Sequence, residues 1–346
     1  MTLKVFSIFS LEDRLQAQIR EVLQPVAGQL AVLPGFSLGK VAGDESKFGS
    51  SEKEQARTQR ETFVKEQLAE AQVVIAGALS AEQFKAAPML EWINVPFAGV
   101  NRLLMTQEIV DSDVLVTNSA GIMAPALADQ VLGYVLSFSR ALPQQWQAQQ
   151  QGRWLPNQDL KLYELAGRTL GIVGYGNIGR EVAKRAKAFG MRLVATKTNT
   201  QGDYPELDTL WPDSGLDGLL AESDYVVICA PLTPQTEGLI GRVQLEKMKP
   251  TAYLINIARG QLVRENELIE VLQEKRISGA ALDVFEQEPL PSESPLWSLD
   301  NVILTPHSSG NFDGFMQRSI ELFCNQLRRY VAHEPLVNVV DKKRGY

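Results

Sequence analysis

The sequence predicts an α/β fold of two domains, the larger of which contains a doubly wound parallel sheet of the Rossmann type. A chain of 346 residues, 45% of them apolar, can bury the core of a two-domain protein. From residue 169 onward, short apolar runs alternate with stretches of helical spacing, which is the pattern of strand–helix–strand units. A glycine-rich stretch joins the first of these runs to a helical pattern, as at the ligand-binding edge of such a sheet.

The composition excludes several classes of protein. The net charge is −7 and the sequence has no basic stripe, which argues against nucleic acid or an anionic membrane as a partner. No apolar run is long enough to span a membrane and no signal peptide precedes Leu3, so we expect a soluble, cytoplasmic protein. Cys229 and Cys324 fit neither a disulfide framework nor a metal site, and the only histidines are His307 and His333. We therefore expect no metal.

The first part of the chain predicts a small α/β domain, because strand and helix patterns alternate in it. The predicted elements are a strand over 3–7, an amphipathic helix over 11–23, a surface loop over 35–55, a charged helix over 52–71 and strands over 72–76 and 92–95. A longer helical pattern follows over 124–149, and its length suits a single helix that crosses between two domains.

The stretch Thr169–Lys187 predicts a dinucleotide-binding turn. Leu170–Val173 is a short apolar run typical of a strand buried on both faces, and Gly174, Gly176 and Gly179 follow it in the pattern G-x-G-x-x-G. The first glycine permits a tight turn, the second lets a pyrophosphate approach the backbone, and the third lets the following helix pack close to the strand. The free N–H groups and the dipole at the helix N-terminus would then hold the phosphates.

The end of the next predicted strand indicates which dinucleotide binds. An NAD site has Asp or Glu there, about 20 residues beyond the first glycine, to accept a hydrogen bond from the ribose 2′-OH. This chain has Thr196, Lys197, Thr198 and Asn199 instead, a cation flanked by hydroxyls. That set suits a 2′-phosphate, so we expect NADP to be preferred, with NAD as the alternative. Lys197 could instead be a solvated loop lysine.

Six predicted strands follow one another in the second part of the chain. They cover residues 170–173, 193–196, 225–229, 253–257, 280–284 and 302–304. In a doubly wound sheet, ligands bind at the carboxyl ends of the strands. Arg259 follows the fourth of these strands and His307 follows the sixth. The sequence therefore predicts an active site at that edge of the sheet.

The residues at that edge suit nicotinamide-dependent chemistry. His307 is the natural acid–base group, because an imidazole changes its protonation state near neutral pH. Arg259 offers a planar fork that matches a carboxylate. Glu286 and Glu288 both follow the strand that ends at Val284, and either could orient the imidazole and stabilise its charged form. Each of these residues alone could be an ordinary surface residue, but their joint placement supports a site.

Several segments carry a resemblance to a known family. They are Phe97–Asn101, Val173–Gly179, Ala230–Thr236, Asn256–Gly260, Leu282–Pro289, Thr305–His307 and Asn338–Asp341, with Gly345 and Tyr346 at the end. Their kind and order resemble the D-isomer-specific 2-hydroxyacid dehydrogenase family. The resemblance runs from about residue 90 to the end of the chain, and several independent motifs in order are far more specific than the glycine pattern alone.

The resemblance implies catalytic roles for three residues. Arg259 matches the arginine that binds and polarises the 2-oxo acid, and His307 matches the acid–base. Glu288, rather than Glu286, matches the carboxylate that pairs with the histidine.

The resemblance also implies the ligand contacts. The backbone N–H groups of Ala98, Gly99 and Val100 would hold the substrate carboxylate. Asp283 would contact the nicotinamide amide, and Ala258 would lie near the nicotinamide ring. The expected cofactor-binding positions are Gly174, Tyr175, Gly176, Asn177, Ile178, Gly179, Thr196, Lys197, Thr198, Ala230, Pro231, Thr236, Ala258, Asp283, His307 and Gly310.

The family fold implies the domain organisation. A smaller, flavodoxin-like α/β substrate domain would be discontinuous, comprising residues 1–118 and 308–346, and the dinucleotide-binding Rossmann domain would comprise residues 119–307. The helix predicted over 124–149 resembles the dimer-forming element of the family, so we expect a homodimer. Residues 35–70 are longer than the corresponding family segment and receive no role.

We therefore expect a reductase that converts 2-oxo acids to D-2-hydroxy acids, reversibly, by hydride transfer from a nicotinamide cofactor, with NADPH favoured. Two alternatives keep the fold. One is a dinucleotide-sensing regulatory protein, since some relatives are transcriptional corepressors, although the intact set of Arg259, Glu288 and His307 argues against pure binding. The other is a dehydrogenase of formate or phosphite. The sequence does not identify the particular 2-oxo acid or the physiological direction.

Overall fold

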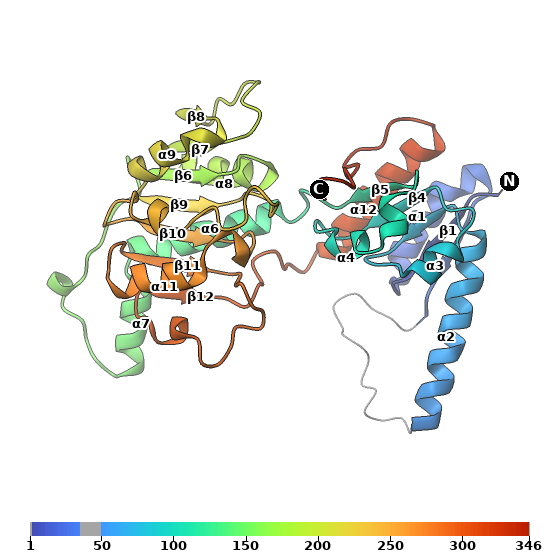
Figure 1. Cartoon of the computed structure of the whole chain (residues 1–346), viewed down its shortest axis with the longest axis horizontal. Helices are drawn as coiled ribbons and strands as arrows, with labels where there is room; N and C mark the ends of the chain where they lie inside the picture. The colour runs from blue at the N-terminus through green and yellow to red at the C-terminus, as the bar shows by residue number, and fades with distance from the viewer. Residues whose placement is uncertain (1, 35–49, 346) are drawn as a thin grey trace. The chain divides into compact units, whose positions relative to one another are not determined.

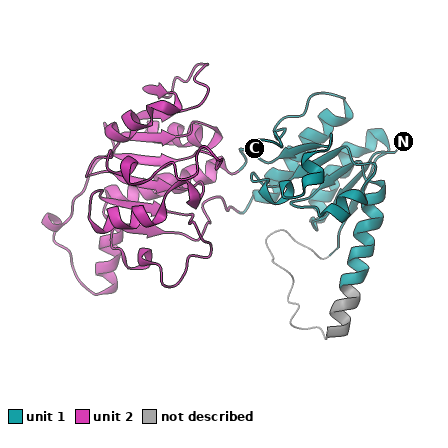
Figure 2. Cartoon of the chain, viewed as in Figure 1, with its two compact units in different colours: residues 1–122, 313–346 teal, residues 123–312 magenta. Residues whose placement is uncertain are grey.

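The computed structural model describes residues 2–34 and 50–345, which form two compact units (Figures 1 and 2). Unit 1 comprises residues 1–122 and 313–346, and unit 2 comprises residues 123–312. Unit 1 is thus discontinuous in the sequence. The chain passes between the units at residues 122 and 312, where the sequence analysis expected breaks near residues 118 and 307.

Unit 1 is built around a five-stranded parallel sheet with the strand order β2-β1-β3-β4-β5. This is the strand order of flavodoxin-like domains, so the predicted fold class of this unit is confirmed. The strands are β1 Lys4–Ser7, β2 Gln29–Val32, β3 Val73–Ile75, β4 Trp92–Val95 and β5 Leu115–Asn118. The α-helices are α1 Asp13–Leu23, α2 Ser50–Glu70, α3 Ala81–Lys85, α4 Asn101–Leu104, α5 Gln107–Val110 and α12 Phe315–Val331.

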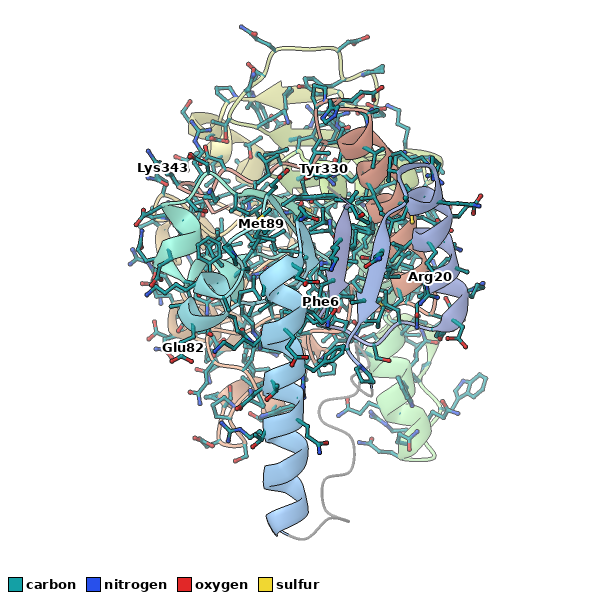
Figure 3. The ribbon with its side chains drawn as sticks, turned by 90° about the vertical axis from the view of Figure 1, so that its right-hand side faces the viewer. Phe6, Arg20, Glu82, Met89, Tyr330 and Lys343 are labelled. Atoms are coloured by element: carbon teal, nitrogen blue, oxygen red, sulfur yellow. The ribbon has the colours of Figure 1, made fainter. Side chains whose placement is uncertain are left out.

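Both faces of this sheet are covered. Val74 belongs to one hydrophobic cluster, whereas its neighbours Val73 and Ile75 belong to the cluster on the opposite face, as the alternation of strand side chains requires. Helix α12 joins the unit through Trp92, whose ring stacks on Phe323 with centroids 5.3 Å apart. Figure 3 shows this unit from outside, with its helices around the sheet and α2 extending beyond it.

Unit 2 is built around a seven-stranded parallel sheet with the strand order β12-β11-β10-β9-β6-β7-β8. The strands are β6 Thr169–Val173, β7 Arg192–Thr196, β8 Thr209–Trp211, β9 Tyr225–Ile228, β10 Tyr253–Asn256, β11 Gly279–Leu282 and β12 Val302–Leu304. The α-helices are α6 Ala124–Ser139, α7 Leu142–Gln150, α8 Asn177–Ala188, α9 Leu216–Glu222, α10 Arg242–Leu245 and α11 Glu265–Gln273. Because the strand order reverses between β6 and β9, their carboxyl ends mark the ligand-binding crevice of such a sheet.

The predicted strands are present in both units, but three further strands were not predicted. These are β2, β5 and β8, and each lies at an edge of its sheet. An edge strand is paired and covered on fewer sides, so its sequence needs less continuous apolar character than a central strand such as β6, which is buried at every position. The hydrophobic pattern alone therefore left these strands undetected.

The prediction of one continuous helix over 124–149 is wrong. Helix α6 ends at Ser139 and α7 begins at Leu142, with Ala141 between them in the left-handed conformation at φ 52°. Pro143 explains the break, because proline has no N–H to donate and its ring would clash with the carbonyl of Ser139 in a continuous helix. Two helices therefore stand where one was expected.

The prediction of a loop over 35–55 falls largely outside the described residues. Where the description resumes, α2 runs from Ser50 to Glu70, so the helix predicted over 52–71 is confirmed. The loop prediction is wrong for residues 50–55, of which 52–55 were also included in the helix prediction. Among the residues that the structure describes, no helix is long and apolar enough to cross a membrane. The expected cytoplasmic location stays a prediction from the sequence.

Candidate active site

The glycine turn between β6 and α8 is closed by tight backbone contacts. A Cβ atom added to Gly174, which has φ 95°, would lie 2.7 Å from the backbone nitrogen of Ala230. A Cβ atom added to Gly179 would lie 2.8 Å from the carbonyl oxygen of Gly174, so this glycine does let α8 pack against β6. Both positions therefore require glycine.

Gly176, the middle glycine of the turn, borders open space instead of a close backbone contact. Nothing lies within 4 Å of a Cβ atom built on Gly176, which is the N-cap of α8. The open space is next to the free N–H groups of Asn177 and Ile178 in the first turn of the helix, where an anion is stabilised. These residues fit the phosphates of a dinucleotide.

Residues at the end of β7 form hydrogen bonds with this turn. The N–H of Tyr175 donates to the carbonyl oxygen of Thr196 at 2.9 Å, and the N–H of Gly174 donates to the Thr196 hydroxyl at 3.3 Å. Lys197 reaches back to the same turn, since its Nζ donates to the carbonyl oxygen of Tyr175 at 2.9 Å. Thr198 is exposed. Thr196 and Lys197 thus lie beside the turn, and their contacts with a cofactor stay predictions.

The segment after β9 also adjoins the turn. Ala230 packs on Gly174, as described above, and Pro231 begins a loop that Thr236 closes. The Thr236 hydroxyl donates to the carbonyl oxygen of Pro231 at 2.7 Å and accepts the N–H of Thr233 at 2.8 Å. Thr236 therefore shapes this loop from within.

Arg259 follows β10 on a loop that Asn256 fixes. The side-chain amide of Asn256 donates to the carbonyl oxygen of Arg259 at 2.9 Å and accepts the N–H of Ala258 at 3.1 Å. The guanidinium of Arg259 donates to the carbonyl oxygen of Ala258 at 2.6 Å and has no carboxylate partner among the described residues. The next position, Gly260, requires glycine, because a Cβ atom there would lie 1.9 Å from the backbone of Phe285. The loop thus presents a cation that can bind an acid.

His307 and Glu288 form a hydrogen-bonded pair at the ends of β12 and β11. His307 Nδ1 lies 2.7 Å from Glu288 Oε2, and the other oxygen of Glu288 accepts the N–H of Phe285 at 3.0 Å. Glu286 points elsewhere, since its carboxylate accepts the N–H of Glu265 at 3.0 Å. The structure therefore brings His307 together with Glu288 and not with Glu286. The second ring nitrogen of the histidine stays available for proton transfer.

Asp283 holds the loop that carries His307. Its side chain is 1% exposed, and its two oxygens accept the N–H groups of Ser308 and Ser309 at 2.9 and 3.0 Å as well as the hydroxyl of Thr305. Its backbone oxygen accepts the N–H of His307 at 2.8 Å. His307 has φ 50°, a left-handed conformation that is costly for a residue with a side chain, and Asp283 compensates that cost.

This role of Asp283 was not predicted from the sequence, and the expected contact of Asp283 with the nicotinamide amide stays a prediction. The role of Tyr134 of α6 was also not predicted. Its hydroxyl lies 2.6 Å from the Thr305 hydroxyl and extends the same network. No sequence motif signals either role, because both depend on the three-dimensional path of the 305–309 loop.

Ser309 is a further candidate that the sequence analysis missed. It is 4% exposed, and its hydroxyl has no hydrogen-bond partner among the described residues. It lies in the turn after His307, next to Gly310, whose added Cβ would lie 3.1 Å from the sulfur of Met123. A buried hydroxyl without a partner is rare and suits a polar ligand group.

A cavity of about 600 Å³ adjoins the histidine–glutamate pair. Its lining is mostly apolar and comprises Phe285, Glu288, Pro289, Leu290, Trp297, Leu304, Thr305, Pro306 and His307. No cluster of metal-ligating side chains occurs in residues 2–34 and 50–345.

The expected substrate loop lies in unit 1. It follows β4, and the carbonyl oxygen of Ala98 accepts the side-chain amide of Asn118 at 2.8 Å, which fixes the loop at its centre. In the described part of the chain, the N–H groups of Ala98 and Gly99 have no acceptor, and Val100 is buried as the N-cap of α4. Free backbone donors of this kind suit a carboxylate.

Comparison with known proteins identifies relatives of this chain. Residues 132–309 match the family described as D-isomer specific 2-hydroxyacid dehydrogenase, NAD binding domain. The chain is 35% identical over 275 residues to a glyoxylate reductase of Korarchaeum cryptofilum, covering 78% of this chain and 82% of that protein. It is 33% identical over 285 residues to a D-3-phosphoglycerate dehydrogenase of Methanocaldococcus jannaschii, covering 82% of this chain and 54% of that protein.

A solved structure resembles the fold over its whole length. It is a D-isomer specific 2-hydroxyacid dehydrogenase from Xanthobacter autotrophicus Py2, crystallised in complex with NADPH and MES. The two chains share 29% sequence identity and superpose with a TM-score of 0.78, covering 100% of this chain and 99% of the other.

Replacing Asp283 by Ala should destabilise unit 2. The buried N–H group of Ser309 and the partly buried N–H group of Ser308 would lose their acceptor, which should lower the free energy of unfolding by about 2–5 kcal/mol. Urea unfolding followed by tryptophan fluorescence measures the change. Asp300→Ala is the control, because Asp300 is exposed, and it should change the free energy by less than about 0.5 kcal/mol. Equal stability of the two variants would contradict the role given to Asp283.

Proposed function

The chain belongs to the D-isomer specific 2-hydroxyacid dehydrogenase family, and from this premise we propose that Arg259, Glu288 and His307 are its catalytic residues. It is an NAD(P)-dependent oxidoreductase that reduces 2-oxo acids. The observation that carries the assignment is the 2.7 Å contact between His307 Nδ1 and Glu288 Oε2. Arg259, which has no carboxylate partner in the described chain, follows β10 at the same edge of the sheet. No observation favours a sensor protein or a formate or phosphite dehydrogenase.

Each catalytic residue has one task in this proposal. A nicotinamide cofactor, held by the residues of the glycine turn, would supply the hydride for C2 of the 2-oxo acid. Protonated His307 gives the proton of its free ring nitrogen to the carbonyl oxygen, which becomes the hydroxyl. Glu288 stabilises the imidazolium before this transfer and fixes the orientation of the ring. Arg259 binds the carboxylate and, as a fixed cation, stabilises the negative charge that develops on oxygen.

We assign the ligands to the two units in the same way. Unit 1 is the substrate domain, and the N–H groups of Ala98, Gly99 and Val100 bind the substrate carboxylate. Unit 2 is the dinucleotide domain. The open position at Gly176 and the N-terminus of α8 support this assignment. The cofactor contacts proposed from the sequence include Gly174, Ala258 and Gly310 at this same edge of the sheet.

Glu288→Gln should lower kcat/KM for reduction about 10-fold or more near neutral pH, because the imidazolium loses its carboxylate partner. Loss of the Glu288 charge next to the imidazole should also change the pH dependence of reduction. Steady-state pH–rate profiles measure both effects. Glu286→Gln is the matched control, because its carboxylate accepts the N–H of Glu265 instead. An unmoved profile in Glu288→Gln would remove Glu288 from the mechanism.

We propose that NADP is the preferred cofactor. The chain has no carboxylate at the end of β7, and Lys197 is held beside the glycine turn by its contact with Tyr175. The related Xanthobacter protein was crystallised with NADPH.

Lys197→Asp should lower the ratio of kcat/KM for NADPH to that for NADH about 10-fold or more. Lys184→Asp, on the exposed side of α8, should leave the ratio unchanged. An equal loss with both cofactors would exclude Lys197 from this selection.

We propose that the enzyme is a homodimer formed through α6 and α7. An apolar cavity of about 520 Å³ lies on this face, and Leu142 and Trp146 in its lining are 49% and 68% exposed.

The double substitution Leu142→Glu, Trp146→Glu would place charges in the interface and should yield a monomer by sedimentation velocity. Val243→Glu, on exposed α10, should remain a dimer. A wild-type monomer, or a double variant that still dimerises, would contradict the proposal.

A further inference from the structure

Tyr204 lies between two cations that come from different elements of unit 2. Arg180 Cζ, in the first turn of α8, is 5.5 Å from the centre of the Tyr204 ring, and Lys197 Nζ, just after β7, is 5.9 Å from it. Both distances are within the range of cation–π attraction. The loop between β7 and β8 therefore brings an aromatic ring to two positive charges.

The position of Tyr204 is fixed by its own contacts. Its hydroxyl donates to the carbonyl oxygen of Gln201 at 2.8 Å, which closes the loop on itself. Its ring packs edge-on against the ring of Tyr175, with centroids 5.6 Å apart and an angle of 85° between the planes. Tyr175 belongs to the glycine turn and is 1% exposed. Tyr204 is thus anchored to a buried residue of the turn.

Arg180 and Lys197 have no carboxylate partners among the described residues. Arg185, in the same helix as Arg180, pairs with Asp129 and Glu181, and Arg192, in the same strand as Thr196, pairs with Glu222. Two uncompensated cations close to one ring repel each other, and an anion bound between them would offset this repulsion. A ligand with more than one negative charge would therefore suit the position of Arg180 and Lys197 around the Tyr204 ring.

One carboxylate lies near this cluster, and it is directed to a different group. Glu206 Oε2 accepts a hydrogen bond from the Tyr175 hydroxyl at 3.4 Å. Burial, with the charge of Glu206, raises the pKa of Tyr175 to about 12, so the phenol stays neutral and can donate this bond at physiological pH. Glu206 forms no ion pair with Arg180 or Lys197 in the described residues, and their charges remain available.

Both cations are tied to the dinucleotide turn. Arg180 follows Gly179 directly in the sequence, and Lys197 donates to the carbonyl oxygen of Tyr175 within the turn. We propose that Arg180 and Lys197 form a two-cation clamp for the 2′-phosphate of NADP, with Tyr204 as the residue that positions both. This inference rests on the proposed cofactor preference and adds to it a second cation and a positioning residue. A phosphate monoester carries close to two negative charges at neutral pH, which matches the two cations.

Binding of adenosine fragments tests the clamp without any turnover. Isothermal titration calorimetry would compare 2′,5′-ADP, which carries the 2′-phosphate, with 5′-AMP, which lacks it. The wild type should bind 2′,5′-ADP more tightly than 5′-AMP. Arg180→Gln and Lys197→Gln should each weaken 2′,5′-ADP binding about 10-fold and leave 5′-AMP binding within about twofold. Lys184→Gln, an exposed cation of the same helix, is the matched control and should bind both like the wild type.

The positioning role of Tyr204 has its own pair of variants. Tyr204→Leu removes the aromatic face and should weaken 2′,5′-ADP binding about three- to tenfold, whereas Tyr204→Phe keeps the face and should restore it. Affinity for 5′-AMP reports whether each variant is folded. Equal loss in Tyr204→Leu and Tyr204→Phe would overturn the cation–π positioning.

The outcomes separate the clamp from the function on which it rests. If Arg180→Gln keeps the wild-type preference for 2′,5′-ADP over 5′-AMP, the clamp is wrong while the NADP preference stands. If the wild type binds 2′,5′-ADP no better than 5′-AMP, the NADP preference fails and the clamp fails with it. Neither result would affect the assignment of His307 and Glu288 to catalysis.

Discussion

The carboxylate of Asp283 holds the part of the structure on which the chemistry depends. A histidine in the left-handed conformation keeps its place only if the surrounding loop is fixed, and Asp283 fixes it with four hydrogen bonds from residues 305–309. The network continues through Thr305 to Tyr134 of α6. Since Glu288 reaches the imidazole at 2.7 Å, the orientation of the ring is set from both sides. A buried group outside the catalytic set therefore determines whether the pair can form.

The parallel sheet of unit 2 explains why these groups meet at all. Every strand in it runs in the same direction, so the segments that follow β6, β7, β9, β10, β11 and β12 all emerge at one edge. Neighbouring segments pack closely at that edge, since Gly174 lies against the backbone of Ala230 and Gly260 lies against the backbone of Phe285. Residues far apart in the sequence thereby become neighbours, and a phosphate-binding turn and an acid–base pair share one edge of the sheet.

Sequence reasoning succeeded where one local rule was sufficient. The strand–glycine–helix pattern predicted the turn, and the strand-end rule predicted Arg259 and His307 at the same edge. The choice of Glu288 over Glu286 came only from the family resemblance, because both residues lie on an irregular segment whose path sets which one reaches the histidine. The break at Pro143 could have been predicted, since a proline inside a helical pattern ends the helix. The edge strands, the role of Asp283 and the contacts of Tyr204 required the three-dimensional structure.

In the proposed mechanism, His307 transfers the proton during reduction of a 2-oxo acid. The most direct test is the loss of NADPH absorbance with glyoxylate and other 2-oxo acids, in the wild type and in His307→Asn, with NADPH binding measured for both by fluorescence. We predict that the two proteins bind NADPH alike, that the wild type oxidises it with at least one 2-oxo acid, and that His307→Asn does so at least about 100-fold more slowly. Oxidation at the wild-type rate by His307→Asn, or binding without oxidation in the wild type, would contradict the account.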